Sequence, residues 1–366
     1  MAEIKLETFN YPEDLTEQRK LFVECFPETL GTPVVTEEHY KWKFKSFPAK
    51  AKETSYEYVA RLDGEIIGYY AAIPYEYNIQ GKTYTIGMVC DVMTGIKARG
   101  KGVFTKLGIY STEQLKKEGV AFSTGYPIRS EVIPGHKKAG WEFPFKIPMY
   151  GKFIKMDSFV KTRKKSFLIP FANIILHLYN GTVNLFNKKI KTTSIFKEYY
   201  SSDQINEIQD LDDFFSEWTT ENPIALNKNK QFLKWRLGAP EKKYHVVIAR
   251  NKEDNKIIGY TIFREVEKEG VPCIGVLDFC TLNRYKKFAF ILLKEIEKMA
   301  KTKNAELILL MMMRRKAKEY KISSNGFLKT PFPFSFIIKQ FDQTIDSDFL
   351  KNEKNWNLMW IDSDDL

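Results

Sequence analysis

The pattern of apolar and polar positions predicts helices followed by strands in the first part of the chain. Residues 12–26 and 37–44 carry apolar side chains three and four positions apart, which is typical of helices that bury one face. Alternating residues follow at 57–62 and 66–73. Asp63-Gly64 between them is the residue pair of a two-residue hairpin turn, so we expect two antiparallel strands here.

A longer strand and a longer helix come next. The strand ends near Thr94, and an amphipathic helix is expected from about 101 to 118, with Gly119 as its C-cap. Residues 120–125 then have the apolar character of another strand. Because strands and helices alternate after an antiparallel start, the sequence predicts an α/β fold with a mixed sheet and helices on its faces.

Four landmarks of this segment recur later in the chain, in the same order. They are Tyr40–Phe44 with Leu233–Leu237, Ile66–Tyr69 with Ile257–Tyr260, Asp91 with Asp278, and Gly140-Trp141 with Gly326-Phe327. Helices expected at 202–218 and 230–237, and strands expected at 244–250 and 257–264, follow the same order as in the first copy. A repeat this long predicts a tandem duplication of a whole domain, with the second copy degenerate.

Composition supports two folded cores. The chain has 366 residues, of which 43% are hydrophobic and 28% charged, which excludes a disordered protein. The four cysteines are too scattered for a disulfide framework or a paired metal site, so no metal is expected. The first residues, MAEIKLETF, contain no apolar signal core, and we expect a cytoplasmic protein.

The distribution of charged residues along the chain indicates further segments. The net charge of +11 is concentrated between 146 and 191, where ten Lys or Arg residues stand against Asp157. The last 26 residues are acidic. We therefore expect four segments: a first domain at 1–150, a basic amphipathic linker at 151–200, a second domain at 201–340 and an acidic tail at 341–366.

Residues 161–191 combine basic clusters with an apolar run at 167–186. Asn173, His177 and Asn180 interrupt that run, so a transmembrane span is a poor interpretation. We expect an amphipathic interdomain helix, and an interfacial helix on an anionic membrane is the alternative. Nucleic acid is not an expected partner, because basic and aromatic residues are not interleaved as in known modules.

The junction between the long strand and the long helix reads Arg99-Gly100-Lys101-Gly102. Two glycines at the start of a helix let the backbone approach an anion, and the first N–H groups of a helix have no intrahelical partner. The two cations favour a diphosphate over a monoanion. This junction therefore predicts a phosphate-binding loop.

The order of these elements, together with this motif, resembles the GNAT superfamily of acyl-CoA-dependent N-acetyltransferases over about 4–145, and more weakly over 200–340. The resemblance implies that the loop binds the diphosphate of acetyl-CoA and that the strand from Met88 to Thr94 pairs with the pantetheine arm. Phe104 stands where the family usually has a small residue. The implied cofactor-binding residues are Val92, Thr94, Arg99, Gly100, Lys101, Gly102, Val103 and Phe104. The second copy has Asn283–Phe288 at this junction, without glycine, so one site per chain is expected.

Acetyl transfer needs a group that accepts the ammonium proton and an acid for the leaving thiolate. His136 occupies the position of the family's tyrosine acid, four residues before Gly140. Asp91, on the strand implied to hold the cofactor, is a candidate base, although its counterpart Asp278 in the second copy favours a structural role. Glu131, a chain of water molecules and the acidic C-terminal end are the alternatives.

The resemblance thus implies an N-acetyltransferase that moves acetyl to a primary amine by direct attack in the first domain. The acceptor is a small molecule, a sugar or a peptide amine. Two alternatives stay open at this stage. One is an aminoacyl-tRNA-dependent transferase of the kind that builds peptidoglycan bridges, and the other is a non-catalytic binding or scaffold protein.

Overall fold

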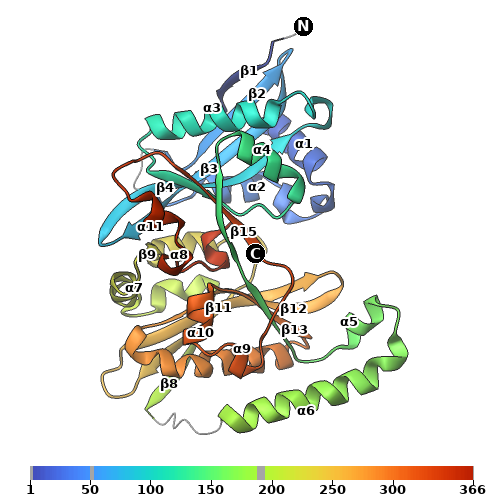
Figure 1. Cartoon of the computed structure of the whole chain (residues 1–366), viewed down its shortest axis with the longest axis vertical. Helices are drawn as coiled ribbons and strands as arrows, with labels where there is room; N and C mark the ends of the chain where they lie inside the picture. Colours follow the sequence, from blue (N-terminus) through green and yellow to red (C-terminus); the bar gives the residue numbers. More distant parts are fainter. Residues whose placement is uncertain (1–2, 50–52, 188–193, 366) are drawn as a thin grey trace. The chain divides into compact units, whose positions relative to one another are not determined.

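The computed structural model describes residues 3–49, 53–187 and 194–365. Their contacts divide the chain into two compact units (Figure 1). Unit 1 contains Met1–Lys146, Gly238–Glu241 and Ser335–Glu353, and unit 2 contains Ile147–Leu237, Lys242–Phe334 and Lys354–Leu366.

Unit 1 is built on a mixed sheet in the order β1-β2-β3-β4-β5-β15-β6. Within it β4 and β5 run parallel, whereas β1, β2, β3 and β4 pair antiparallel with their neighbours and β15 is antiparallel to β5. The strands are β1 (Lys5–Thr8), β2 (Tyr56–Leu62), β3 (Glu65–Ile79), β4 (Lys82–Thr94), β5 (Phe122–Gly125), β6 (Glu142–Ile147) and β15 (Phe334–Gln340). The helices are α1 (Leu15–Cys25), α2 (Glu37–Tyr40) with a π-helical turn η3 (Lys41–Lys45), α3 (Val103–Lys117) and α4 (Ile133–Lys138). The predicted mixed α/β fold is confirmed.

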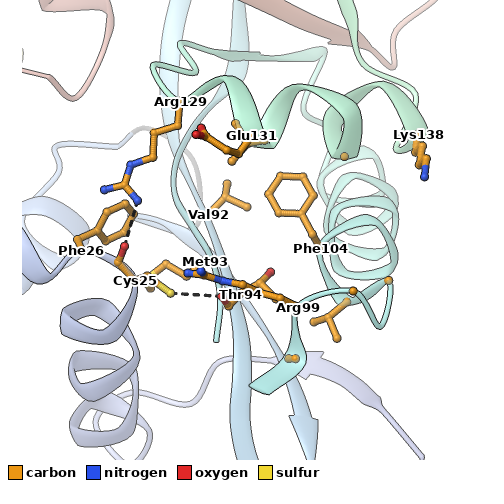
Figure 2. Close-up of a pocket in the computed structure, with 16 residues that line it drawn as sticks. Cys25, Phe26, Val92, Met93, Thr94, Arg99, Phe104, Arg129, Glu131 and Lys138 are labelled. Atoms are coloured by element: carbon orange, nitrogen blue, oxygen red, sulfur yellow. Dashed lines mark hydrogen bonds between the residues drawn. The ribbon is translucent and has the colours of Figure 1, made fainter. Parts of the chain in front are cut away.

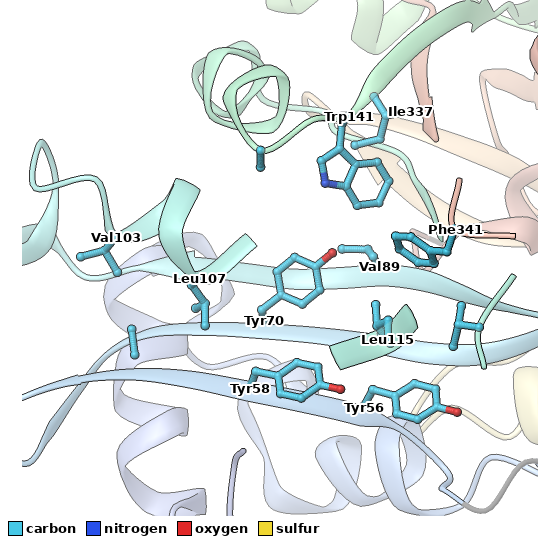
Figure 3. Packing of buried hydrophobic residues seen from close by; sticks show 14 of the residues in the cluster. Tyr56, Tyr58, Tyr70, Val89, Val103, Leu107, Leu115, Trp141, Ile337 and Phe341 are labelled. Carbon is cyan, nitrogen blue, oxygen red and sulfur yellow. The ribbon is translucent and has the colours of Figure 1, made fainter. Parts of the chain in front are cut away.

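The core of unit 1 fixes where α3 lies on the sheet. Val103, Leu107 and Leu115 of α3 are buried in one apolar cluster with Tyr58 and Trp141 (Figure 3). The approach is close, since a Cβ added to Gly68 in β3 would lie 3.0 Å from Cγ1 of Val103. The first turn of α3 is therefore held firmly at the end of the sheet where β4 stops.

Unit 2 repeats this arrangement. Its sheet has the order β14-β7-β13-β12-β11-β10-β8, with β12 and β13 parallel. The strands are β7 (Met149–Phe153), β8 (Ile195–Ser201), β10 (His245–Asn251), β11 (Ile257–Lys268), β12 (Val271–Thr281), β13 (Leu307–Met311) and β14 (Leu328–Lys329), with the short β9 (Ile224–Leu226) also in this unit. The helices are α5 (Asp157–Thr162), α6 (Ile169–Asn187), α7 (Leu211–Thr220), α8 (Lys230–Leu237), α9 (Ala289–Thr302) and α10 (Arg314–Glu319), and α11 (Ser347–Lys351) belongs to unit 1.

The two sheets match strand by strand when the second order is read from β8. β8 then corresponds to β1, β12 to β4, β13 to β5, β7 to β15 and β14 to β6. The two orders are consistent with a tandem duplication. Each unit contains one strand from the other half of the sequence, because β15 pairs with β5 in unit 1 and β7 pairs with β13 in unit 2.

The units therefore differ from the four segments expected from the sequence. The expected linker at 151–200 contains strands of the unit 2 sheet at both ends, β7 and β8. The expected acidic tail at 341–366 contains the fully buried Trp356 and Trp360. Buried apolar residues within these segments attach them to the units. The expected boundaries were drawn from the distribution of charged residues, which does not reveal such contacts. The predicted helix at 167–186 is present as α6.

Candidate active site

The Arg99–Gly102 loop contains two glycines in the left-handed region at the start of α3. Gly100 and Gly102 have φ of +78° and +76°, and Gly102 is the N-cap of α3. A Cβ at either glycine would meet nothing within 4 Å. Conformation, rather than lack of space, is therefore what requires glycine at both positions. The first N–H groups of α3 lie at this turn, where the partial positive charge of the helix terminus favours an anion.

β4 separates from β5 just before this loop. The two strands pair from Gly87 to Val89, and β4 then continues to Thr94. At Asp91 the pairing between β3 and β4 shifts, and Asp91 itself has φ of +47°. A bulge of this kind bends the strand and increases its twist. The main chain of β4 after Cys90 consequently extends past the end of β5.

A cavity of about 880 Å³ lies at this place in unit 1. Its volume falls in the range that is usual for sites that bind small molecules and cofactors. Of the predicted cofactor-binding residues, the cavity wall contains all but Lys101, namely Val92, Thr94, Arg99, Gly100, Gly102, Val103 and Phe104. Figure 2 shows Val92, Thr94, Arg99 and Phe104 grouped around it.

Nine other residues of the described chain line the cavity, and of these the sequence singles out only Glu131, as an alternative base. The nine are Cys25, Phe26, Met93, Ala98, Arg129, Glu131, Val132, Gly135 and Lys138. Arg129 is held by three contacts: its guanidinium lies 4.9 Å from the ring centre of Phe26, pairs with Glu28 and donates to the carbonyl of Cys25 at 3.1 Å. Arg99, Arg129 and Lys138 bring three cations to the wall, where Arg129 is paired with Glu28 and Glu131 adds a carboxylate, so the wall keeps an excess of positive charge that suits an anionic ligand.

Gly135 makes room for the large side chain at position 104. The Phe104 ring lies against α4 beside the cavity, and a Cβ at Gly135 would be 2.6 Å from its Cε1 atom. The ring also contacts the His136 ring, with 5.0 Å between their centres. The absence of a side chain at Gly135 therefore leaves space for Phe104, which stands where the family usually has a small residue.

His136 is buried, and it is not among the residues that line the cavity. Its ring packs between Phe104 and Trp141, with 5.6 Å between its centre and that of Trp141. Burial lowers the pKa of His136 to about 4, so the imidazole is neutral near pH 7. This placement gives no support to the predicted role of His136 as the acid for the leaving thiolate.

Asp91 is also outside the cavity wall. Its carboxylate accepts a hydrogen bond from Lys43 Nζ at 2.8 Å, and 8% of the Lys43 and 12% of the Asp91 side chain is exposed. In unit 2 the counterpart Asp278 pairs with Lys228 at 2.6 Å. A buried lysine and aspartate at the strand bulge are thus common to both units, which favours a structural role over the predicted role of base.

In unit 2, acidic side chains contact the junction between β12 and α9. Asn283–Phe288 forms a 3₁₀ turn before α9, and the Asn283 N–H donates to the carboxylate of Glu221 at 2.8 Å. Arg284 pairs with Glu217. A carboxylate bound at the start of this turn repels a phosphate, which supports the expectation of one cofactor site per chain.

Comparisons with known proteins agree with this geometry. The sequence profile of the Acetyltransferase (GNAT) domain family matches residues 11–144. No curated protein matches the sequence. Among residues that the structure describes, we find no group of three or more His, Cys, Asp or Glu side chains placed to hold a metal ion.

Three solved structures illustrate the fold. A probable N-acyltransferase from Enterococcus faecalis V583 has a TM-score of 0.65 and 14% identity, over 93% of this chain and 73% of that chain. A GCN5-related N-acetyltransferase from Anabaena variabilis has a TM-score of 0.63 and 12% identity, over 93% and 73%. The N-myristoyltransferase of Saccharomyces cerevisiae with bound myristoyl-CoA has a TM-score of 0.59 and 12% identity, over 93% and 79%.

The fold and the family match agree with each other. Residues 11–144 match the acetyltransferase (GNAT) domain family, and the chain has the fold of the solved N-acyltransferases of this superfamily. The resemblance inferred from the Arg99–Gly102 motif is thereby confirmed. Acyl transfer is the general reaction that the family match supports.

Proposed function

We propose that unit 1 is an N-acetyltransferase that moves acetyl from acetyl-CoA to a primary amine. The observation that carries this proposal is the junction of β4 and α3, where two left-handed glycines and a helix N-terminus border a cavity with three cations. In this proposal the diphosphate binds the amide groups of Gly100, Gly102 and Val103, with Arg99 and Lys101 beside it. The pantetheine arm follows the main chain of Val92 and Thr94, and Phe104 forms part of the wall.

The acetyl group would then lie near the bulge of β4, where an amine attacks the thioester carbonyl directly. A carbon–nitrogen bond forms, the carbon–sulfur bond breaks, and the thiolate of coenzyme A leaves. The ammonium must lose a proton before attack, and the carboxylate of Glu131 in the cavity wall is the candidate acceptor, directly or through water. The nitrogen carries a positive charge after attack and loses a second proton, which passes through solvent in the cavity to the leaving thiolate.

Binding of acetyl-CoA tests the first step. Isothermal titration calorimetry should give a micromolar dissociation constant for the intact protein. A series of acyl-CoA esters of increasing chain length, measured in the same way, identifies the preferred donor. Absence of binding to every ester would contradict the proposal and leave the tRNA-dependent transferase and the non-catalytic protein as the remaining hypotheses.

Release of free thiol from acetyl-CoA tests the second step. Amino sugars, polyamines and peptides with a free N-terminus are the first acceptors to screen. Glu131→Gln should lower kcat while the dissociation constant of acetyl-CoA changes little. Unchanged kcat in Glu131→Gln would show that a chain of water molecules, rather than this carboxylate, takes the proton.

A further inference from the structure

Helix α6 of unit 2 turns its apolar side outward. Phe171, Ile174, Ile175 and Leu178 are exposed by 66%, 59%, 68% and 63%. Their spacing of three and four residues places them on one face of the helix. Phe167, in the turn before α6, is 75% exposed as well. Large exposed apolar patches mark surfaces that another partner covers.

The polar side of α6 is the side that faces unit 2. Asn173 donates to the Asp157 carboxylate at 2.6 Å and accepts from the Met156 N–H at 3.0 Å. Asn180 donates to the carbonyl of Phe153 at 3.1 Å. These bonds fix the rotation of the helix about its axis, so the apolar face cannot turn inward without breaking them. The outward orientation is therefore a property of the fold.

Basic residues stand immediately before this face. Lys161, Arg163, Lys164 and Lys165 are all exposed, and they lie within the ten residues that precede α6. Lys188, Lys189 and Lys191, which the sequence places after α6, lie outside the described residues. No helix in the described part of the chain is long and apolar enough to cross a membrane. An apolar face beside exposed cations is instead the pattern of a helix that lies in a membrane interface.

We propose that α6 and the preceding basic segment bind the surface of an anionic phospholipid bilayer. The face formed by Phe167, Phe171, Ile174, Ile175 and Leu178 enters the interface between headgroups and acyl chains, and the cations at 161–165 contact the headgroups. A second protein copy would also cover an apolar face, but four like charges beside it would repel each other across a symmetric contact. Charge complementarity therefore favours the lipid. This inference is independent of the proposed acetyl transfer.

Vesicle sedimentation tests the proposal with the full chain. The protein should bind vesicles of phosphatidylglycerol and phosphatidylcholine at least ten times more tightly than vesicles of phosphatidylcholine alone, and high salt should weaken the binding. Phe171→Asp/Ile175→Asp should lower binding by at least about tenfold, because two apolar groups leave the interface. Lys164→Glu/Lys165→Glu should lower it by about 25-fold or more, since each cation near the surface contributes about fivefold.

Phe332→Asp is the matched control, because Phe332 is 67% exposed in the same unit but lies outside α6. It should leave vesicle binding unchanged, and circular dichroism should show that all variants are folded. Equal binding to both kinds of vesicle, or loss of binding in Phe332→Asp alone, would overturn the proposal. A dimer in light scattering that Phe171→Asp/Ile175→Asp disperses, without vesicle binding, would show that a second copy covers this face.

Discussion

Substitution of Gly135 by alanine tests whether this glycine is needed to make room for the Phe104 ring. Helix propensity alone predicts that alanine stabilises the protein, whereas a clash with Phe104 predicts that it destabilises it. The new Cβ would lie 2.6 Å from Cε1 of Phe104 and closer still to Cδ1. Carbon atoms in contact prefer about 3.5–4.0 Å, so the ring must move by on the order of 1 Å. The ring borders the cavity, and movement away from α4 carries it toward the space proposed for acetyl-CoA (Figure 2).

The two energies to compare predict a measurable loss of stability. Alanine in place of glycine stabilises a helix by about 0.5–1 kcal/mol, whereas overpacking costs about 1–3 kcal/mol. We expect Gly135→Ala to lower the free energy of unfolding by about 1 kcal/mol. We also expect the dissociation constant of acetyl-CoA to rise at least about tenfold, which corresponds to about 1.4 kcal/mol.

Calorimetric titration and urea denaturation of a double-mutant cycle with Phe104→Ala measure both effects. The small side chain at 104 removes the clash, so Phe104→Ala/Gly135→Ala should recover most of the affinity that Gly135→Ala loses. A coupling energy of at least about 1 kcal/mol is expected for two residues in direct contact. The reasoning is refuted if Gly135→Ala raises stability with unchanged affinity, or if the double variant binds no better than Gly135→Ala.

Three further predictions concern the loop, the buried histidine and the ion pair. Gly102→Val and Gly81→Val should both lose stability, because both glycines have positive φ. Calorimetry should find weaker acetyl-CoA binding in Gly102→Val alone, and a loss in both would point to general damage. The depressed pKa of His136, about 4 in the folded protein, means that the unfolded chain binds the proton more tightly. The free energy of unfolding is therefore highest above about pH 6.5. It falls as the pH falls toward 4, by up to roughly 3 kcal/mol. Urea denaturation at pH 7 and 4.5 should show a smaller loss in His136→Phe than in the parent protein, and equal losses would contradict burial as the cause. Lys43→Met leaves Asp91 without this partner in a buried place and should cost about 3–5 kcal/mol in thermal or urea unfolding, whereas Lys41→Met in the exposed pair with Glu37 should change little. Similar stability of the two lysine variants would argue against the structural role of Asp91.

Local sequence patterns predicted individual helices and turns well, because the residues that set each local backbone conformation are neighbours in the sequence. The apolar spacing of 230–237 gave α8 at Lys230–Leu237, and Asp63-Gly64 gave the turn between β2 and β3, where both residues have positive φ. The Arg99–Gly102 motif predicted a glycine turn at the start of a helix, and Gly102 is the N-cap of α3. Such features depend on a few neighbouring residues and not on the rest of the chain.

Features that depend on long-range contacts could not be predicted in this way. The repeat indicated two sheets, but nothing local shows that β15 pairs with β5 or that β7 pairs with β13. Gly135 compensates for Phe104 from another helix, and Arg129 reaches the cavity wall through contacts with Phe26 and Cys25. The family resemblance implied that His136 is the acid, but the resemblance could not show that its ring is buried between Phe104 and Trp141.

A crystal structure of the protein with coenzyme A tests the central claim most directly. The account predicts that the diphosphate oxygens lie within hydrogen-bond distance of the amides between Gly100 and Phe104, with the pantetheine arm beside Val92–Thr94. A diphosphate bound elsewhere, for example at the 3₁₀ turn that begins at Asn283 in unit 2, would contradict it.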